Sequence, residues 1–269
     1  MKKEVKAIIL GSLLTLIISL SMFTESKMQN NIVTNSNNEL SNKKIGWGIQ
    51  RKNSHEQPEL GAKNTELINK YNGMALGNKD KKYIYLTFDL GYEAGYTSKI
   101  LDALKQNNVK GTFFVTAHYV NTASDLVKRM IDEGHIVGNH TVNHKSMPSL
   151  SDDELTTEVM KLHQVIYEKY NYEMKYMRPP KGEFSERTLS LCEKLGYKTV
   201  MWSFAYVDWE ENKQPSEEEA MQKIIPNLHN GEIMLLHATS KTNADIMDRM
   251  IKKIKEDGYE IRILEEFIQ

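Results

Sequence analysis

The regular alternation of strand-like and helix-like segments after Lys82 is the feature that most constrains the fold. Short apolar runs, rich in β-branched and aromatic residues, fall at 83–88, 111–116, 135–137, 174–177, 197–201, 231–237 and 260–264. Segments with a helical pattern lie between them, at 97–107, 123–133, 151–170, 185–195, 215–228 and 243–257. One of these helices opens with a capping box, in which Ser151 is followed three residues later by Glu154. The alternation predicts βα units around a largely parallel sheet.

The first strand of this series ends in a carboxylate. Asp89 stands where the apolar run stops, and Gly91 and Gly95 loosen the backbone that follows. A carboxylate at the carboxyl end of a strand, followed by a flexible loop, is where α/β barrels place catalytic groups. The alternative is that Asp89 caps the helix that begins near Thr97.

Composition limits the classes of protein to which the chain can belong but does not identify its function. The chain has 269 residues, enough for one large α/β domain or two small ones. The net charge is −1 and the basic residues form no stripe, which disfavours nucleic acid as a partner. The single cysteine, Cys192, rules out an intrachain disulfide and is expected to be a small buried apolar residue.

The N-terminal segment has the composition of an export signal. Three lysines precede an uncharged run at 7–23, and no clear small-residue cleavage site follows it. We interpret residues 1–24 as a signal peptide or, slightly favoured, an uncleaved signal anchor. The polar stretch 25–44 reads as a linker, 45–80 as a lead-in that packs on the domain, and 81–269 as the domain itself. The domain is therefore expected outside the cytoplasm, membrane-anchored or secreted.

Two histidines follow the strand pattern near residue 137. His140 and His144 lie four residues apart, which on a helical turn would place both imidazoles on one side. Neutral imidazole is a common ligand of zinc and similar divalent metals, so the pair is a candidate metal site. The alternative is two solvated loop histidines.

Three more polar residues stand near the ends of strand patterns. His237 terminates an apolar strand, where it is either a functional group or a satisfied core histidine. Arg178 precedes Pro179 and Pro180, which restrict its backbone and that of the residues after it. Asp208 follows the strand region 201–204 and supplies a further carboxylate. Its neighbour Trp209 is either a wall of a site or plain core.

These pieces, in this order, resemble the five motifs of a known family. The segments are Thr87-Phe88-Asp89, His140-x3-His144, Arg178-Pro179-Pro180, Asp208-Trp209 and Leu235-Leu236-His237. They are similar to the motifs of the polysaccharide deacetylases, also called the NodB-homology domain or carbohydrate esterase family 4. The resemblance covers 82–267 and implies an α/β fold, a distorted (β/α) barrel of the NodB-homology type. The site is then expected at the carboxyl ends of the strands.

Other segments resemble the delta-lactam-biosynthetic de-N-acetylases of that family. They are 85–97, 111–116, 178–182 and 207–209. This resemblance implies hydrolytic de-N-acetylation of N-acetylmuramic acid in peptidoglycan whose peptide stem a muramoyl-alanine amidase has removed. The product would lead to muramic δ-lactam in the spore cortex of an endospore-forming bacterium. The partner would be the glycan strand of the cell wall.

The resemblance also assigns roles to residues. Asp89 would be the general base, kept ionised by Arg178, and His237 would be the general acid, held by Asp208. His140 and His144 would bind the metal. Pro180 and Lys181 would contribute to substrate binding, with a backbone N–H near Lys181 at the oxyanion, and Trp209 and Leu236 would wall the acetyl pocket.

Leu90 is the largest departure from the family pattern. The common pattern has a second Asp there as a metal ligand, so the divalent cation (zinc, cobalt, magnesium or manganese) is expected to be weakly held. One alternative substrate is N-acetylglucosamine in peptidoglycan or chitin, or an acetyl ester of xylan. An alternative of another class is a non-catalytic glycan-binding module on the same fold. Leu90 favours that alternative, whereas the presence of Asp89 and His237 disfavours it.

Overall fold

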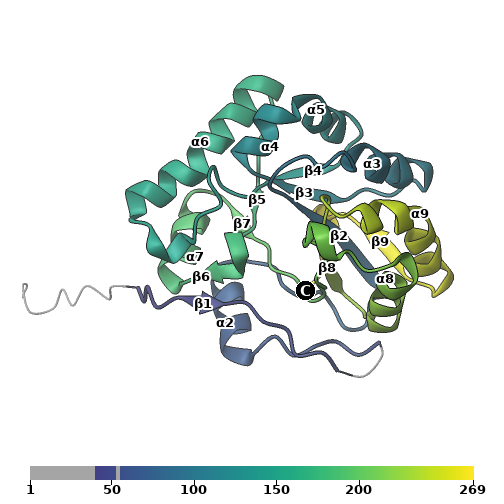
Figure 1. The fold of residues 1–269 in the computed structure, drawn as a ribbon. Helices are drawn as coiled ribbons and strands as arrows, with labels where there is room; N and C mark the ends of the chain where they lie inside the picture. The colour runs from purple at the N-terminus through teal and green to yellow at the C-terminus, as the bar shows by residue number, and fades with distance from the viewer. Residues whose placement is uncertain (1–39, 53–54) are drawn as a thin grey trace, which may run out of the picture. The chain divides into compact units, whose positions relative to one another are not determined.

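A parallel sheet organises the part of the chain that the computed structural model describes, residues 40–52 and 55–269. Its strands follow the order β7 (Lys198–Thr199), β5 (Tyr176–Met177), β4 (Ile136–Asn139), β3 (Thr112–Val115), β2 (Tyr83–Leu90) and β8 (Glu232–His237). Figure 1 shows these strands surrounded by helices. The expected α/β class is confirmed, with the sheet curled into a half-barrel.

Strand β2 lies at the centre of the pairing. Along one edge it pairs with β8, from Ile84 opposite Glu232 to Asp89 opposite His237. The other edge is shared, because β9 (Glu260–Arg262) pairs with the start of β2 and β3 pairs with its end. Seven of the eight β2 residues are buried, as expected for a strand with both faces covered.

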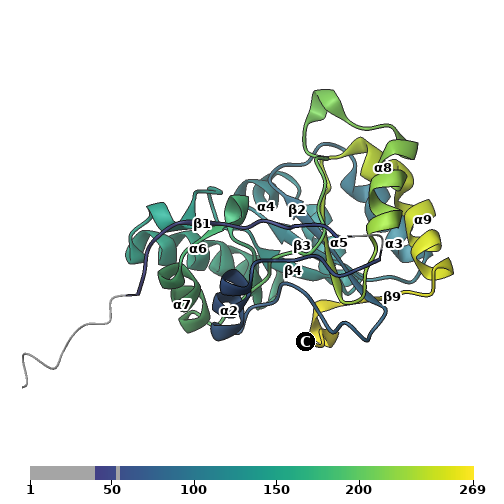
Figure 2. The ribbon, with the colours of Figure 1, turned by 90° about the horizontal axis from the view of Figure 1, so that it is seen from below.

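The two faces of the sheet are covered differently. Residues of β2 at even positions, such as Leu86 and Phe88, belong to the large core cluster under the helices. These helices are α3 (Thr97–Gln106), α4 (Ala117–Thr122), α5 (Ser124–Asp132), α6 (Asp152–Tyr170), α7 (Glu186–Lys194), α8 (Glu217–Ile224) and α9 (Lys241–Glu256). Figure 2 shows α8 and α9 lying together beside α3. Odd-numbered Tyr85 packs in a smaller cluster on the opposite face, with Met74 and Leu264.

The segment before β2 adds a third apolar cluster. Helix α2 (Ala62–Lys70) contributes Ile68, which packs in a cluster with Phe184 and Leu189. Nearby, β1 (Ile45–Gly46) pairs antiparallel with β6 (Glu183–Phe184). Residues 41–44 also contact the domain, since the Asn42 amide donates to the Pro148 carbonyl oxygen. The predicted linker therefore extends too far, because these last residues are bound in place.

Most expected elements are present, but one helix is additional and several strands are shorter than expected. The capping box is real: the Ser151 N–H donates to Glu154 at 2.8 Å and the Glu154 N–H donates to Ser151 at 3.2 Å. Helix α4 was not expected, and the strand expected at 197–201 is only two residues long. The strand region 201–204 makes a single bridge, Phe204 to Met234, because the chain there crosses from β7 to β8.

The predicted signal or anchor at 1–24 lies outside the described residues. Among the residues that are described, no helix has both the length and the apolar character needed to cross a membrane.

Candidate active site

The polar residues singled out in the sequence gather at one rim of the sheet. Asp89 and His237 are register partners at the ends of β2 and β8. His140 follows β4 directly, and Arg178 follows β5. Parallel strands bring their carboxyl ends to the same rim, so residues far apart in sequence meet there.

A buried ion pair holds the candidate base. Arg178 Nη1 donates to Asp89 Oδ1 at 2.8 Å, and its Nη2 donates to Thr87 Oγ1 at 2.9 Å. The guanidinium also lies 4.3 Å from the centroid of the Phe114 ring and is fully buried. Burial alone would raise the pKa of Asp89, but Arg178 and His140 outweigh it and lower that pKa below its ordinary value. Asp89 is therefore a carboxylate at neutral pH.

A second pair holds the candidate acid. His237 Nδ1 lies 2.7 Å from Asp208 Oδ1, and the His237 backbone N–H donates to Asp208 Oδ2 at 2.8 Å. This contact assigns the proton to Nδ1 in the neutral ring and leaves Nε2 free. Burial alone would lower the pKa of His237, but the bond and charge of Asp208 outweigh it and raise that pKa above 6.5. The two pairs thus favour opposite protonation states, which suits a base and an acid in one reaction.

His140 and His144 lie together, but not on a helical turn as expected. Their ring centroids are 4.7 Å apart. The backbone has positive φ at both Thr141 and His144, so the segment is a tight loop. The Asn139 side chain accepts from the Thr141 N–H, and Thr141 Oγ1 accepts from the His144 N–H, which stabilises this shape.

The chemistry of these imidazoles fits a metal ligand. His140 Nδ1 lies 2.9 Å from the Arg178 carbonyl oxygen, which assigns it the proton and leaves Nε2 with a lone pair. Burial lowers the pKa of His144 to about 4, so that ring is neutral as well. Leu90 has no atom that could bind a metal ion, and its side chain is fully buried in the core cluster that faces the helices. In the described residues, no cluster of three or more His, Cys, Asp or Glu side chains suits a metal ion.

The remaining predicted site residues differ in their exposure and in whether they lie on the side of His237. Trp209 is 48% exposed, with its ring centroid 5.3 Å from that of His237. Pro180 is buried at the start of a 3₁₀ turn, and Lys181 is exposed with a left-handed φ of 60°. Leu236 lies in the helix-facing core, on the opposite side of β8 from His237. Leu235 shares the side of His237, so it replaces Leu236 as the candidate wall of the acetyl pocket.

Two further residues belong to the site but were not predicted from the sequence. Thr87 accepts from Arg178 and donates to the Met234 carbonyl oxygen at 2.7 Å. It lies two residues before Asp89, so the two-residue period of a strand could have identified it. Asn243 contacts Asp208 from the start of α9, and no local pattern in the sequence indicated it.

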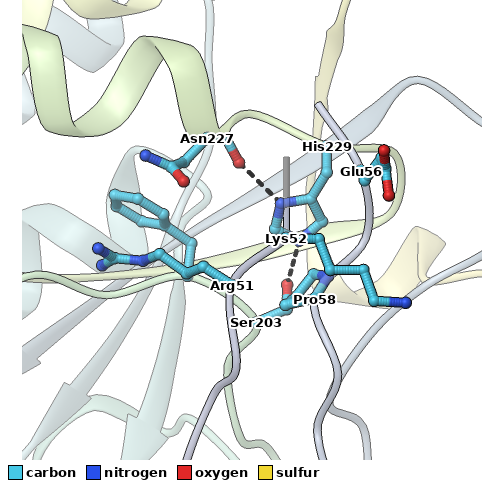
Figure 3. Close-up of a pocket in the computed structure, with 8 residues that line it drawn as sticks. Arg51, Lys52, Glu56, Pro58, Ser203, Asn227 and His229 are labelled. Carbon is cyan, nitrogen blue, oxygen red and sulfur yellow. Dashed lines mark hydrogen bonds between the residues drawn. The ribbon is translucent and has the colours of Figure 1, made fainter. Parts of the chain in front are cut away.

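A separate polar pocket lies at the opposite end of β8 from His237. Figure 3 shows its lining, in which His229 Nε2 lies 2.8 Å from Ser203 Oγ and Nδ1 lies 2.9 Å from the Asn227 carbonyl oxygen. Arg51 and Pro58 of the lead-in also line it. It contains none of the predicted site residues, and its histidine is already satisfied by these neighbours.

Comparison with known proteins identifies the family and supports the fold. A family model for polysaccharide deacetylase matches residues 76–200. Peptidoglycan-N-acetylmuramic acid deacetylase PdaA of Bacillus subtilis is 42% identical over 228 residues, which are 84% of this chain and 87% of that protein. Its structure, described as a family 4 carbohydrate esterase, superposes with a TM-score of 0.82 and covers 85% of this chain and 98% of that one.

Two more distant relatives differ in what their names state. A peptidoglycan-N-acetylglucosamine deacetylase of Bacillus cereus is 33% identical over 195 residues, covering 71% of this chain and 70% of that protein. A family 4 pseudoenzyme of Bacillus anthracis is 29% identical, with a TM-score of 0.68, covering 72% of this chain and 68% of that one.

The fold and the comparisons define a hydrolase that acts on amide bonds, and the candidate acid and the candidate base lie together at the rim of its parallel half-barrel. The chain belongs to the polysaccharide deacetylases, carbohydrate esterase family 4. Deacetylases of this family are generally metal-dependent.

Proposed function

We propose that the protein removes the acetyl group from N-acetylmuramic acid in peptidoglycan strands that have lost their peptide stems, with the help of a divalent metal. The observation that carries the reaction type is the register pairing of Asp89 and His237, each held by its own buried partner. The substrate is supported by 42% identity to a relative named for that sugar. The freed muramic amine can then close on its own lactyl carboxyl to give the δ-lactam of spore cortex.

The proton transfers follow from the two pairs. Asp89 takes a proton from the attacking water, because Arg178 keeps it ionised. His237, in its imidazolium form, gives a proton from Nε2 to the leaving amine, because Asp208 favours that form by raising the pKa of His237 and fixes the direction of the ring. The two groups reach the scissile amide from adjacent strands.

The negative charge that develops on the carbonyl oxygen during the attack must be stabilised by hydrogen-bond donors or a cation. A backbone N–H near Lys181, on the tight turn after Pro180, would supply one such donor. A divalent metal held by His140 and His144 would act as a Lewis acid on that oxygen. Leu235 and the half-exposed Trp209 give the acyl group an apolar surface beside His237.

The deciding experiment compares three glycans. We expect acetate release from glycan pre-treated with a muramoyl-alanine amidase, and little from glycan that still carries its peptide stems. N-acetylglucosamine oligomers should also be poor substrates. Mass spectrometry of cortex muropeptides after digestion would show whether the muramic residue is the one that loses its acetyl group. Equal release from the oligomers and from stem-free glycan would contradict the muramic specificity.

A second candidate substrate is N-acetylglucosamine in peptidoglycan. The relative of Bacillus cereus named for that sugar shares 33% identity with this chain, and the two reactions require the same acid and base. The same comparison of glycans decides between them.

The proposed place of action is outside the cytoplasm, with residues 7–23 as the anchor. The lysine-rich start, the apolar run and the polar stretch that follows support it. Membrane fractionation with an antibody to the domain tests it. Recovery of the protein in the soluble cytoplasmic fraction with an intact N-terminus would contradict it.

A further inference from the structure

The carboxylate of Asp208 has more partners than the histidine it orients. Its Oδ1 faces His237 Nδ1, while its Oδ2 accepts from the His237 backbone N–H. Oδ2 also accepts from Asn243 Nδ2 at 2.6 Å. Asp208 is 1% exposed and Asn243 fully buried, so water does not compete for these contacts. Both oxygens are therefore fixed in direction.

The orientation of the Asn243 amide is itself fixed. Tyr206 donates its hydroxyl to Asn243 Oδ1, so the Nδ2 end must face Asp208. The same Nδ2 lies 3.1 Å from the His237 carbonyl oxygen, a second acceptor that suits only the amide nitrogen. Burial and the charge of Asp208 hold the pKa of Tyr206 well above its usual value, so the phenol remains a donor.

The position of Asn243 depends on the local fold. It is the third residue of α9, and its backbone N–H donates to Ser240 Oγ at 3.1 Å in the N-terminal cap. The loop from His237 to this cap is short, so the start of the helix is held beside the end of β8. Asn243 thus contacts Asp208 at Oδ2, the oxygen that is not bonded to the imidazole.

We infer that Asn243, oriented by Tyr206, is a positioning residue for the general acid: it holds the Asp208 carboxylate in line with His237. This inference rests on the proposed function, because it assigns the alkaline limb of the rate to His237. If the amide is removed, the carboxylate can rotate about its side chain and the imidazole loses its in-line acceptor. His237 then sits in a buried place without the contact that favours its charged form.

Other groups act on His237 as well. Asp89 favours its charged form, whereas Arg178 disfavours it, and His140 and His144 interact electrostatically with it across the site. These groups lie on β2, after β5 and after β4, and none of them contacts Asn243. A change at Asn243 should therefore reach His237 only through Asp208.

The test uses Asn243→Leu, which keeps the approximate volume and removes the donor. We expect kcat to fall about ten- to a hundred-fold with little change in KM, as for other partners that orient a reacting histidine. The alkaline limb of the pH–rate profile should move down by about one unit, because the pKa of His237 falls. Tyr206→Phe should move it in the same direction by less, and it serves alone if Asn243→Leu does not fold.

The matched control is Thr242→Val, on the same helix. This variant also loses one partly buried hydrogen bond, which the Thr242 hydroxyl donates to the Pro215 carbonyl oxygen. Thr242 does not contact Asp208. We expect its pH profile to match the wild type. An alkaline limb that stays in place or rises in both Asn243→Leu and Tyr206→Phe would overturn the inference, as would an equal shift in Thr242→Val.

A measurement without substrate separates this inference from the proposed function. Nitrogen NMR of the His237 ring in the resting protein reports its pKa and the nitrogen that carries the proton. If the wild type released no acetate, the proposed function would fail, but the titration would still test whether Asn243 acts on His237 through Asp208. If the wild type were active and the His237 pKa were unchanged in both variants, only the inference would fail.

Discussion

Arg178 shows how much of the site depends on one residue. It is the largest of the fully buried side chains, and its guanidinium donates to Asp89, Thr87 and the carbonyl oxygens of Val200 and Met201. A buried cation without an anion is costly, so Asp89 stabilises the fold in addition to being the candidate general base. The family resemblance already implied that Arg178 keeps Asp89 ionised, and the structure adds that the two groups form a buried ion pair.

Replacing Asp89 by Asn should therefore have two effects. Acetate release should fall by about 10²–10⁴-fold, because the general base is lost. The free energy of unfolding should fall by about 3–5 kcal/mol, because Arg178 loses its buried counter-charge. Denaturant unfolding and an acetate assay measure the two effects separately. Thr87→Val, which keeps the ion pair, is the control and should lose much less of both; near wild-type turnover in Asp89→Asn would remove it as the base.

At the scale of elements, the segment after β2 has a structural role that its sequence did not reveal. Residues 91–97 carried part of the resemblance to the delta-lactam enzymes. In the structure, Glu93 accepts from the Gly95 N–H at 2.6 Å and from the Tyr119 hydroxyl at 2.9 Å. Glu93 thus connects the loop beside Asp89 to α4. Although it belongs to the segment that resembled the delta-lactam enzymes, the contacts it makes here stabilise the shape of the loop.

We expect Glu93→Ala to lower stability more than catalysis. It removes an acceptor that lies just before α3, a change worth about 0.5–2 kcal/mol in comparable capping contacts. The rate should fall less than in Asp89→Asn, since Glu93 does not contact Asp89. Tyr119→Phe removes only the contact from the tyrosine hydroxyl, leaves those from the Gly95 and Thr97 N–H groups, and should lose less stability. A rate loss as large as that of Asp89→Asn, with no loss of stability, would place Glu93 in the reaction.

The limits of prediction are clearest in the loops. The helices could be predicted because burial of one face imposes a period of about 3.6 on the sequence, and the strands because burial of both faces gives short continuous apolar runs. The 140–144 loop could not, because positive φ at Thr141 and His144 leaves no periodic trace. Leu235 could have been preferred to Leu236 from strand alternation alone. Asn243 could not, since it meets Asp208 only because α9 begins where β8 ends.

At the scale of the whole molecule, the protein's own hydrogen bonds hold the candidate metal-binding histidines in place, and the described residues offer no third side-chain ligand beside them. The carbonyl oxygen of Arg178 orients His140, and the Thr141 side chain shapes the loop of His144. The rim should therefore stay folded when no metal is bound. Leu90 leaves the ion with two neutral imidazoles, which should hold it weakly.

Chelator should therefore abolish activity with little effect on the melting temperature. Added zinc, cobalt, magnesium or manganese should restore the activity. Metal content after extensive dialysis, measured beside activity and thermal unfolding, checks this. Stoichiometric metal that survives dialysis would show that another group replaces the missing carboxylate. Full activity in excess chelator would instead leave His140 and His144 as substrate-binding groups.

The shared edge of β2 has a consequence for how the chain is made. Its neighbours β3, β8 and β9 come from early and late parts of the domain, so β2 is synthesised long before two of its three partners exist. Contacts between such distant segments form slowly, and until they form the edge of β2 is open to pairing with other chains. A nascent or truncated chain that ends before β8 would carry Asp89 on an unpaired edge, without its acid. The pairing of the two candidate catalytic residues and the protection of this edge from aggregation therefore arise together, when β8 pairs with β2.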